Sequence, residues 1–342
     1  MRKLGSLGPI LITGGAGFLG RYLAEAAAKA GSEVTVLDDL SCTNSTFDCP
    51  ELQGPRVRCI KGTVFDAPLV EDLVGRHAVV AHLASVVGVE ETIGRTVNTI
   101  ENLNGTMNVV RALRPDHVAL FTSSADVYGL HSYYYDRPMR ETDFFLFEHA
   151  LVNRWVYAHV KALEENLVSN SPARSVVIRV FNTYGPAMDF PAPKRVMPHF
   201  IASLLNGSPL KLSGDGGQHR SFCHVSDMIR GFVLALEHAG AQRAPFAECF
   251  NIGSPETLTI RQLAEHVIAG AIELGMLKGP LPIEGDAFHY SQPFDDGWSR
   301  VPDISHAREV LGYAPQIAFS AGLRQTLEYY RSFRPRLEAA AG

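Results

Sequence analysis

The sequence predicts an α/β protein in which a doubly wound parallel sheet carries a smaller C-terminal α/β lobe. Short apolar segments alternate with helical segments over residues 9–180, a pattern typical of such sheets. The first apolar segment runs into a glycine-rich turn and then into an alanine-rich helix. From Pro186 onward proline and glycine punctuate the chain and the alternation becomes irregular, which indicates the separate lobe.

The composition excludes several functional classes. With 342 residues, 46% of them hydrophobic, the chain is long enough for one large domain or a large domain with a smaller partner. The net charge is -5 without a Lys/Arg block, so we expect a small-molecule substrate, with no nucleic acid and no membrane as partner. The five scattered cysteines lack a C-x-x-C pair and indicate neither a disulfide framework nor a metal site. Without a signal sequence or a membrane-length apolar run, we expect a soluble cytoplasmic protein.

The N-terminal strand, residues 9–13, is followed by glycines at positions 14, 17 and 20 and by a helix that reaches residue 30. Gly14, Gly17 and Gly20 permit a tight turn, a close backbone approach to a pyrophosphate and close packing of helix on strand. The helix N-terminus offers free N–H groups to phosphate. This context predicts a Rossmann-type dinucleotide site.

The second strand, residues 33–37, ends at Asp38 and Asp39. A carboxylate at this place accepts hydrogen bonds from the ribose hydroxyls of an adenosine and repels a 2′-phosphate. The pair therefore favours NAD over NADP. The alternative is a solvated turn at a strand end.

Further elements follow along the chain as strands at 57–61, 78–83, 117–122 and 175–180 and helices at 68–74, 91–113 and 153–170. Ligands of a parallel sheet bind at the carboxyl ends of its strands. The loops at 82–85 and 122–129 both lie at that edge, so we expect the chemistry there.

One helical segment places a phenol and an ammonium four residues apart, at Tyr157 and Lys161. Residues at i and i+4 share a helix face. A neighbouring positive charge lowers the pKa of a tyrosine, so we expect Lys161 to lower the pKa of Tyr157 and make it a base. Taken alone, the pair is better explained by an amphipathic surface helix whose tyrosine packs and whose lysine is solvated.

The C-terminal half is less regular. We expect a short strand and turn at 210–217 and later helices at 258–274 and 321–333, before a frayed tail from 334. The expected organisation is a cofactor domain over residues 1–182 and a substrate lobe over 183–342, of which 222–252 returns to the main sheet.

Six short motifs occur in a single order: residues 13–20, 82–84, 102–106, 123–129, Tyr157-x-x-x-Lys161 and 181–186. This set resembles the extended short-chain dehydrogenase/reductases that modify nucleotide sugars. The resemblance spans nearly the whole chain, and it implies their Rossmann-type fold.

Within that family the segments 154–157, 179–186, 217–222 and 299–305 are most similar to UDP-glucuronic acid decarboxylases. In those enzymes an arginine just before an x-Pro-x-Ile segment lies in the active site, and Arg300 occupies that place. Two departures stand out. Ser124-Ala125-Asp126 replaces the usual Thr-Ser-Glu, and Thr63 stands where an aspartate commonly meets the adenine, with Asp66 as an alternative.

The resemblance implies roles for individual residues. For catalysis it implies Ser124, Asp126, Tyr157, Lys161 and Arg300. For NAD binding it implies Gly14, Gly17, Phe18, Leu19, Gly20, Asp38, Asp39, Ser41, Thr63, Val64, Leu83, Ala84, Ser85, Asn102, Thr122, Tyr157, Lys161 and Thr183. For binding a UDP-sugar it implies Ser124, Tyr157, Asn182, Arg195, Arg220 and Arg300. It also implies a homodimer formed through helices 91–113 and 153–170.

The expected reaction is oxidation at C4 of UDP-glucuronate, loss of CO2 from C6, and formation of UDP-4-keto-pentose, UDP-xylose or both. Three alternatives remain. A 4-epimerase would use Ser124, Tyr157 and Lys161 identically, and Arg300 argues against it. A 4,6-dehydratase needs an Asp-Glu pair where this chain has Ala125-Asp126. A non-catalytic NAD-binding protein would have no reason to keep the three oxidation residues together.

Overall fold

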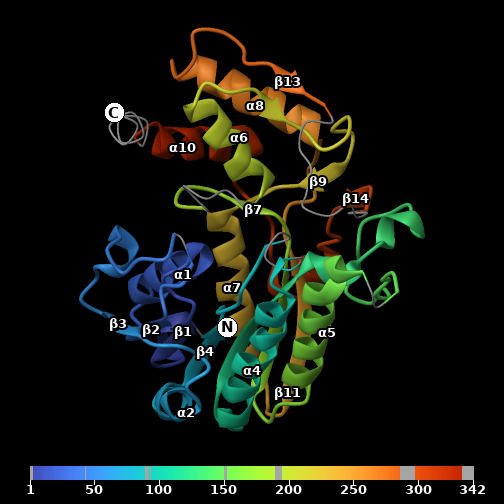
Figure 1. The fold of residues 1–342 in the computed structure, drawn as a ribbon. Helices are drawn as coiled ribbons and strands as arrows, with labels where there is room; N and C mark the ends of the chain where they lie inside the picture. Colours follow the sequence, from blue (N-terminus) through green and yellow to red (C-terminus); the bar gives the residue numbers. More distant parts are fainter. Residues whose placement is uncertain are drawn as a thin grey trace.

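The computed structural model describes residues 3–42, 44–88, 92, 94–149, 152–188, 195–285 and 297–332. Its central feature is a seven-stranded, fully parallel sheet in the order β11-β6-β5-β4-β1-β2-β3 (Figure 1). The strands are β1 Ile10–Thr13, β2 Val34–Asp38, β3 Val57–Lys61, β4 Val79–His82, β5 Val118–Ser124, β6 Arg174–Val180 and β11 Phe246–Ile252. The predicted doubly wound sheet is confirmed.

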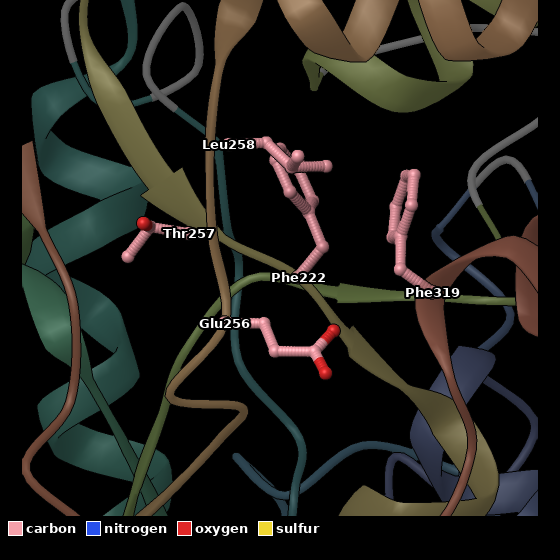
Figure 2. Close-up of a pocket in the computed structure, with 5 residues that line it drawn as sticks. All are labelled: Phe222, Glu256, Thr257, Leu258 and Phe319. Atoms are coloured by element: carbon pink, nitrogen blue, oxygen red, sulfur yellow. The ribbon is translucent and has the colours of Figure 1, made fainter.

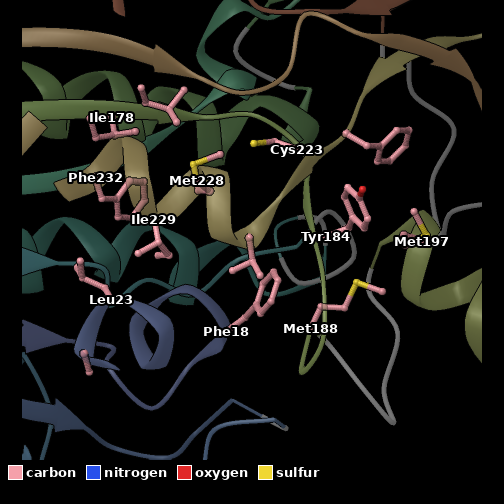
Figure 3. Close-up of a cluster of buried hydrophobic side chains, with 14 of the residues drawn as sticks. Phe18, Leu23, Ile178, Tyr184, Met188, Met197, Cys223, Met228, Ile229 and Phe232 are labelled. Carbon is pink, nitrogen blue, oxygen red and sulfur yellow. The ribbon is translucent and has the colours of Figure 1, made fainter. Parts of the chain in front are cut away.

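Helices cover both faces of the sheet. Those of the N-terminal half and the one that leads into β11 are α1 Phe18–Lys29, α2 Ala67–Gly75, α4 Thr96–Ala112, α5 Val156–Ser169 and α7 Val225–Gly240. Side chains of α2, α4 and α5 pack on one face against Leu11 and Val80. Side chains of α1 and α7 pack on the other face, where Leu23 and Phe232 lie in the cluster of Figure 3. Successive residues of a strand point to opposite faces, so each strand serves both layers.

Two predictions reach beyond the described residues. The helix predicted from residue 91 is observed from Thr96, and residues 91 and 93 lie outside the described part, as does the tail from 334. Among the described residues, no helix is both long and apolar enough to cross a membrane.

The C-terminal lobe sits over the carboxyl edge of the sheet (Figure 1). Its helices are α6 Val196–Leu205, α8 Ile260–Glu273, α9 Ser305–Leu311 and α10 Phe319–Arg331. Its short strands are β7 Thr183–Tyr184, β8 Leu210–Lys211, β9 His219–Ser221, β10 Cys223–His224, β12 Thr257–Thr259, β13 Ile283–Glu284 and β14 Ser299–Arg300. One buried apolar cluster runs from the α1 face of the sheet into Leu204, Leu263 and Leu327 of this lobe. The shared core therefore fixes the lobe above the strand ends.

Candidate active site

The glycine turn lies between β1 and α1. Gly14 has a φ of +69°, and a Cβ on it would lie 2.6 Å from the backbone nitrogen of Ala84. A Cβ on Gly20 would lie 2.3 Å from the carbonyl oxygen of Gly14. Both positions therefore require glycine. The turn brings Gly17 and the first helical residues, Phe18 and Leu19, to the end of β1, where the free N–H groups of α1 suit a pyrophosphate.

Asp38 ends β2 beside this turn. Its carboxylate accepts hydrogen bonds from the backbone nitrogens of Ala16, at 3.0 Å, and Leu40, at 2.9 Å. Burial raises the pKa of Asp38, although both hydrogen bonds act to lower it. Asp39 is exposed and accepts from the backbone nitrogen of Ser41. A glycine cradle with a carboxylate at the end of the second strand fits a dinucleotide cofactor.

The loop after β4 contains Leu83, Ala84 and Ser85. The amide of Asn102 on α4 fixes this loop, because its Oδ1 accepts from the backbone nitrogen of Val86 at 2.8 Å and its Nδ2 donates to the carbonyl of Val86 at 3.0 Å. The Asn102 side chain therefore fixes the predicted cofactor loop by binding the backbone of that loop.

Other predicted cofactor residues have local partners. Thr63 Oγ1 accepts from the backbone nitrogen of Phe65, and Val64 beside it is half-buried. Asp66, the alternative adenine partner, accepts from the backbone nitrogen of Leu69 and so caps α2. Thr183 is buried, and its hydroxyl donates to the carbonyl of Phe181.

Ser124, Tyr157 and Lys161 converge at the carboxyl end of β5. Ser124 is the last residue of that strand, while Tyr157 and Lys161 lie on the buried side of α5. Lys161 Nζ lies 5.7 Å from the centre of the Tyr157 ring and donates to the carbonyl of Thr122 at 3.1 Å. The fold therefore places a phenol, a hydroxyl and an ammonium together.

The net direction of the Tyr157 pKa differs from our expectation. Burial raises the pKa of Tyr157 above its ordinary value, and the negative charges of Asp126 and Glu164 add to this. Lys161 lowers that pKa, as predicted, and so does the hydrogen bond with Ser124, but neither outweighs burial. Lys161 therefore acts on the pKa of Tyr157 in the predicted direction, while burial keeps that pKa raised in the protein alone.

Asp126 forms ion pairs with two arginines close to the phenol of Tyr157. It lies in the short 3-10 turn η3, Ala125–Tyr128, and its Oδ1 is 2.8 Å from Nη1 of Arg300 and 3.2 Å from Nη2 of Arg154. Arg154 and Arg300 are only 3% and 8% exposed. Two buried guanidinium groups thus meet one carboxylate that also acts on the pKa of Tyr157.

Arg154 was assigned no role from the sequence. It lies in the 3-10 turn η5, Asn153–Trp155, directly before α5. In the sequence, a role in the site was indicated by the position of Arg154, three residues before Tyr157 and within the same predicted helix. Its burial depends on tertiary packing and could not be read from that position.

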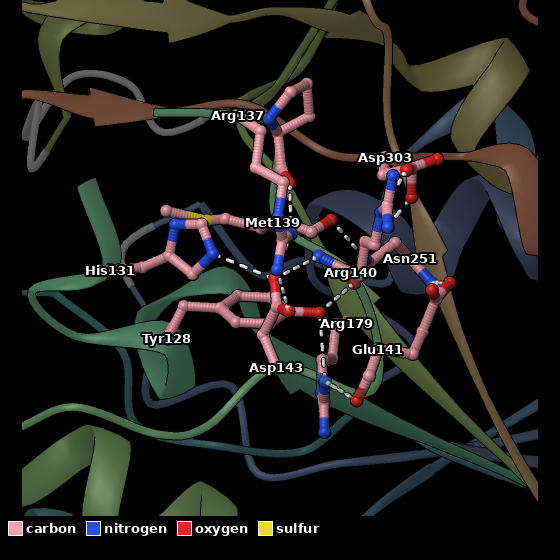
Figure 4. Close-up of polar contacts among 11 residues, drawn as sticks. Tyr128, His131, Arg137, Met139, Arg140, Glu141, Asp143, Arg179, Asn251 and Asp303 are labelled. Atoms are coloured by element: carbon pink, nitrogen blue, oxygen red, sulfur yellow. Dashed lines mark hydrogen bonds and ion pairs between the residues drawn. The ribbon is translucent and has the colours of Figure 1, made fainter. Parts of the chain in front are cut away.

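Hydrogen bonds across the chain hold the segment of Arg300 in place. Met139 donates its backbone N–H to the carbonyl of Val301 at 2.9 Å, and its own carbonyl accepts from the backbone nitrogen of Asp303 at 2.7 Å. Asn251, at the end of β11, donates its side-chain amide to the same carbonyl (Figure 4). Arg300 itself belongs to β14, which pairs with β9 so that Arg300 stands opposite Arg220.

The three remaining substrate-side predictions occupy different surroundings. Arg220 is buried and donates to the backbone carbonyls of His219 and Gly297. Arg195 is exposed at the start of α6, with its guanidinium 5.8 Å from the ring centre of Phe18. Asn182 connects β6 to β7, and its carbonyl accepts from the backbone nitrogen of Cys223. Arg220 therefore adjoins Arg300, and Arg195 lies beside the glycine turn.

A pocket of about 310 Å³ lies in the C-terminal lobe, lined by Phe222, Glu256, Thr257, Leu258 and Phe319 (Figure 2). It shares no residue with the group around Tyr157. Its walls are mainly aromatic and aliphatic, and its one carboxylate belongs to an exposed residue, so we assign it no part in the chemistry.

A dinucleotide cradle combined with a buried tyrosine–lysine pair defines an NAD-dependent α/β enzyme class. A family model described as the NAD dependent epimerase/dehydratase family matches residues 10–253. The chain belongs to this family, and NAD is its cofactor.

Individual relatives give a finer picture. UDP-N-acetyl-alpha-D-glucosaminuronate decarboxylase of Bacillus cytotoxicus is 32% identical over 94% of this chain and 97% of its own. UDP-glucuronic acid decarboxylase 3 of Arabidopsis thaliana is 33% identical over 94% of this chain and 89% of its own. Among solved structures, UDP-glucuronic acid 4-epimerase from Bacillus cereus, in complex with UDP-glucuronic acid and NAD, has a TM-score of 0.78 at 25% identity and covers 95% of this chain and 99% of its own.

Proposed function

We propose that this protein is an NAD-dependent decarboxylase of a UDP-hexuronate, with UDP-glucuronate as the first substrate to test. The observation that carries the proposal is the buried contact of Arg300 and Arg154 with Asp126 beside Tyr157. A guanidinium group binds a carboxylate through two parallel hydrogen bonds, and burial strengthens such a contact. The names of the two decarboxylase relatives support the same reading.

Oxidation at C4 is assigned to Tyr157, Ser124 and Lys161. Tyr157 takes the proton of the C4 hydroxyl, while Ser124 donates a hydrogen bond to the same oxygen and orients it. When bound, NAD accepts the hydride from C4, can return it later, and brings a positive charge that acts on the phenol in the same direction as Lys161. Lys161 stabilises the phenolate during this step.

Loss of CO2 follows from the position of the new ketone. A C4 ketone is beta to the C6 carboxylate, so breaking the C5–C6 bond releases CO2 and leaves its electron pair at C5 as an enolate. Arg300 holds the carboxylate before cleavage, and Asp126, itself held by Arg154, fixes the guanidinium of Arg300. A water molecule then protonates C5. Return of the hydride gives UDP-xylose, whereas early release gives UDP-4-keto-pentose and NADH.

Binding roles are proposed for the remaining predicted residues. Asp38 would accept from the adenosine ribose, and the glycine turn would hold the pyrophosphate of NAD. Arg220, Arg195 and Asn182 would contact the diphosphate side of the UDP-sugar, because arginine matches phosphate geometry. In this proposal residues 1–182 form the cofactor domain, and 183–342 form the substrate lobe.

A 4-epimerase is the second candidate. The Bacillus cereus structure of similar fold is a 4-epimerase and was solved with UDP-glucuronic acid. An epimerase would use the same oxidation residues and return the hydride to the opposite face of the ketone, keeping the carboxylate. The mass of the product therefore separates the two candidates.

The test is incubation of the purified protein with NAD and UDP-glucuronate, with UDP-N-acetylglucosaminuronate in parallel. We expect CO2, together with NADH or a UDP-pentose, from at least one substrate. A product of unchanged mass would contradict decarboxylation and support the 4-epimerase. Arg300→Lys retains a charge but not the paired donors, so CO2 release should fall about tenfold or more while NAD binding is retained. CO2 release at the original rate would show that Arg300 does not hold the carboxylate.

We also propose a homodimer formed through α4 and α5. Val97 and Ile100 on α4 and Leu163 on α5 are 67%, 49% and 54% exposed. Apolar side chains gathered on two neighbouring helices are suited to burial against a second copy. Light scattering should give twice the chain mass, and Ile100→Asp with Leu163→Asp should give the chain mass. A monomeric wild-type protein would rule the dimer out.

A further inference from the structure

Lys161 has a buried carboxylate partner that the reaction above does not use. Glu164 lies three residues further along α5, is only 6% exposed, and its Oε2 is 2.8 Å from Lys161 Nζ. The other oxygen, Oε1, accepts from the hydroxyl of Thr106 on α4 at 2.6 Å. Both carboxylate oxygens are thus engaged, which fixes the side chain.

Glu164 ends a row of buried hydrogen bonds that begins below the glycine turn. Burial lowers the pKa of His82 to about 4, so its ring is neutral at neutral pH. Because Thr106 gives its only hydroxyl proton to Glu164, it must accept from His82 Nε2 at 3.0 Å. His82 Nδ1 then accepts from Thr13 Oγ1 at 2.7 Å. Every proton in the row therefore points toward Glu164.

This arrangement keeps Glu164 ionised. Burial acts to raise its pKa, but Lys161 and the hydroxyl of Thr106 act in the opposite direction, and the net result is a lowered pKa. Burial likewise acts to lower the pKa of Lys161, and Glu164 reverses this so that the pKa of Lys161 is raised. The ion pair thus holds both groups in their charged forms.

The other carboxylates near Tyr157 and Lys161 have different partners, so neither of them replaces Glu164 as the partner of Lys161. Glu165 is engaged by Arg179, at 2.8 Å, and by the hydroxyl of Ser123. Asp126 faces Tyr157 from η3, where it pairs with arginines. Among the described residues, Glu164 is the carboxylate that forms an ion pair with Lys161.

We propose that Glu164 is a positioning residue of the oxidation step: it fixes the Lys161 ammonium beside Tyr157 and, through its own negative charge, sets the pH range in which Tyr157 acts as the base. The inference rests on the proposed role of Tyr157. It adds that Lys161 acts as one half of a fixed ion pair, so its effect on the phenol is partly offset by Glu164.

The test uses the NAD-bound enzyme and the variant Glu164→Gln, which keeps the shape and the acceptor for Thr106 but removes the charge. Phenolate formation is followed by ultraviolet difference absorbance against pH, and the contribution of Tyr157 is obtained by subtracting matched Tyr157→Phe proteins. Loss of a nearby negative charge should lower the midpoint by about one pH unit over the pH range in which Lys161 keeps its charge. Glu71→Gln, an exposed charge change on α2, should leave it unchanged.

A second variant guards against a purely structural effect. Glu164→Asp keeps the charge with a shorter side chain, so its midpoint should stay near that of the wild type. An unchanged midpoint in Glu164→Gln, or an equal shift in Glu164→Asp, would overturn the proposal. Circular dichroism over the same pH range checks that each protein stays folded.

The spectroscopic readout needs no sugar substrate, so it stands apart from the proposed function. A shifted phenolate midpoint without conversion of any UDP-hexuronate would support the role of Glu164 and count against the decarboxylase. CO2 release with an unshifted midpoint would support the decarboxylase and count against Glu164.

Discussion

The two sides of Tyr157 carry similar charges but are built differently. On the helix side, Lys161 and Glu164 form an ion pair within a single turn of α5. On the substrate side, Asp126 meets Arg154 and Arg300 from separate segments, the last of them 174 residues away along the chain (300 − 126). The local side serves the proposed oxidation, and the side assembled by tertiary structure serves the proposed decarboxylation. Proteins that share this fold can therefore keep the helix side of the site unchanged while the residues of the substrate side vary.

The two sides also share one electrostatic effect. Asp126 and Glu164 both raise the pKa of Tyr157 above the value set by burial alone. Each carboxylate is matched by at least one buried cation, so neither is an isolated charge. Substitutions that remove one charge at a time can separate the two contributions.

The largest effect is expected for Tyr157→Phe, which removes the base common to both sides. Loss of a positioned proton acceptor should lower the rate of sugar oxidation about 10³-fold, measured as NADH formation in a single turnover. NAD affinity should change little, because the ring is kept. Tyr134→Phe, at a side chain 71% exposed, is the control and should be fully active. Oxidation at the wild-type rate would remove Tyr157 from the mechanism.

Asp126→Asn breaks only the substrate side and should have an intermediate effect. Arg300 loses its partner, so CO2 released per sugar oxidised should fall about tenfold, the loss expected from one displaced catalytic group. Because Asp126 raises the pKa of Tyr157, its removal should lower that pKa and extend oxidation to lower pH.

Asp126→Glu is the matched control, since it keeps the charge and restores the carboxylate usual in the resembling decarboxylases. Its pH profile should match the wild type. If Asp126→Asn and Asp126→Glu give the same CO2 yield and the same profile, the charge of Asp126 has no part in either effect.

The smallest effect is expected for Thr106→Val, which breaks the helix side without changing its charge. The variant leaves one oxygen of Glu164 and Nε2 of His82 without their partner, which should lower the free energy of unfolding by about 2 kcal/mol. Urea denaturation measures this loss, and oxidation should slow only a few-fold. Thr326→Val, at a buried threonine whose hydroxyl donates to the Gly322 carbonyl, gives the baseline cost of such a change. A loss no greater than this baseline would show that the row of hydrogen bonds contributes little.

Local pattern was sufficient to predict much of the fold and part of the site. The first six strands lie within two residues of their predicted bounds, because apolar segments bounded by turns are local signals. Tyr157 and Lys161 meet because helical spacing alone brings them together. The ion pair of Asp126 with Arg300 was not predicted, although both residues were assigned to the site.

What could not be predicted depends on burial. The upward shift of the Tyr157 pKa follows from the burial of the phenol, which cannot be read from the spacing of residues in the sequence. Arg154 and Glu164 look like ordinary surface charges of a helix until the fold buries them. Asn102 was predicted to contact the cofactor, but the hydrogen bonds of its amide with the backbone of Val86 were not predicted.

The row of hydrogen bonds from Thr13 to Glu164 has a consequence for which sequences this fold can accept. Since each member donates to the next, none can be exchanged for an apolar residue without leaving a buried donor or acceptor without its partner. Positions 13, 82, 106 and 164 therefore form one joint constraint on mutation. A homologue with an apolar residue at position 164 should also have altered position 106, or have made room for a water molecule.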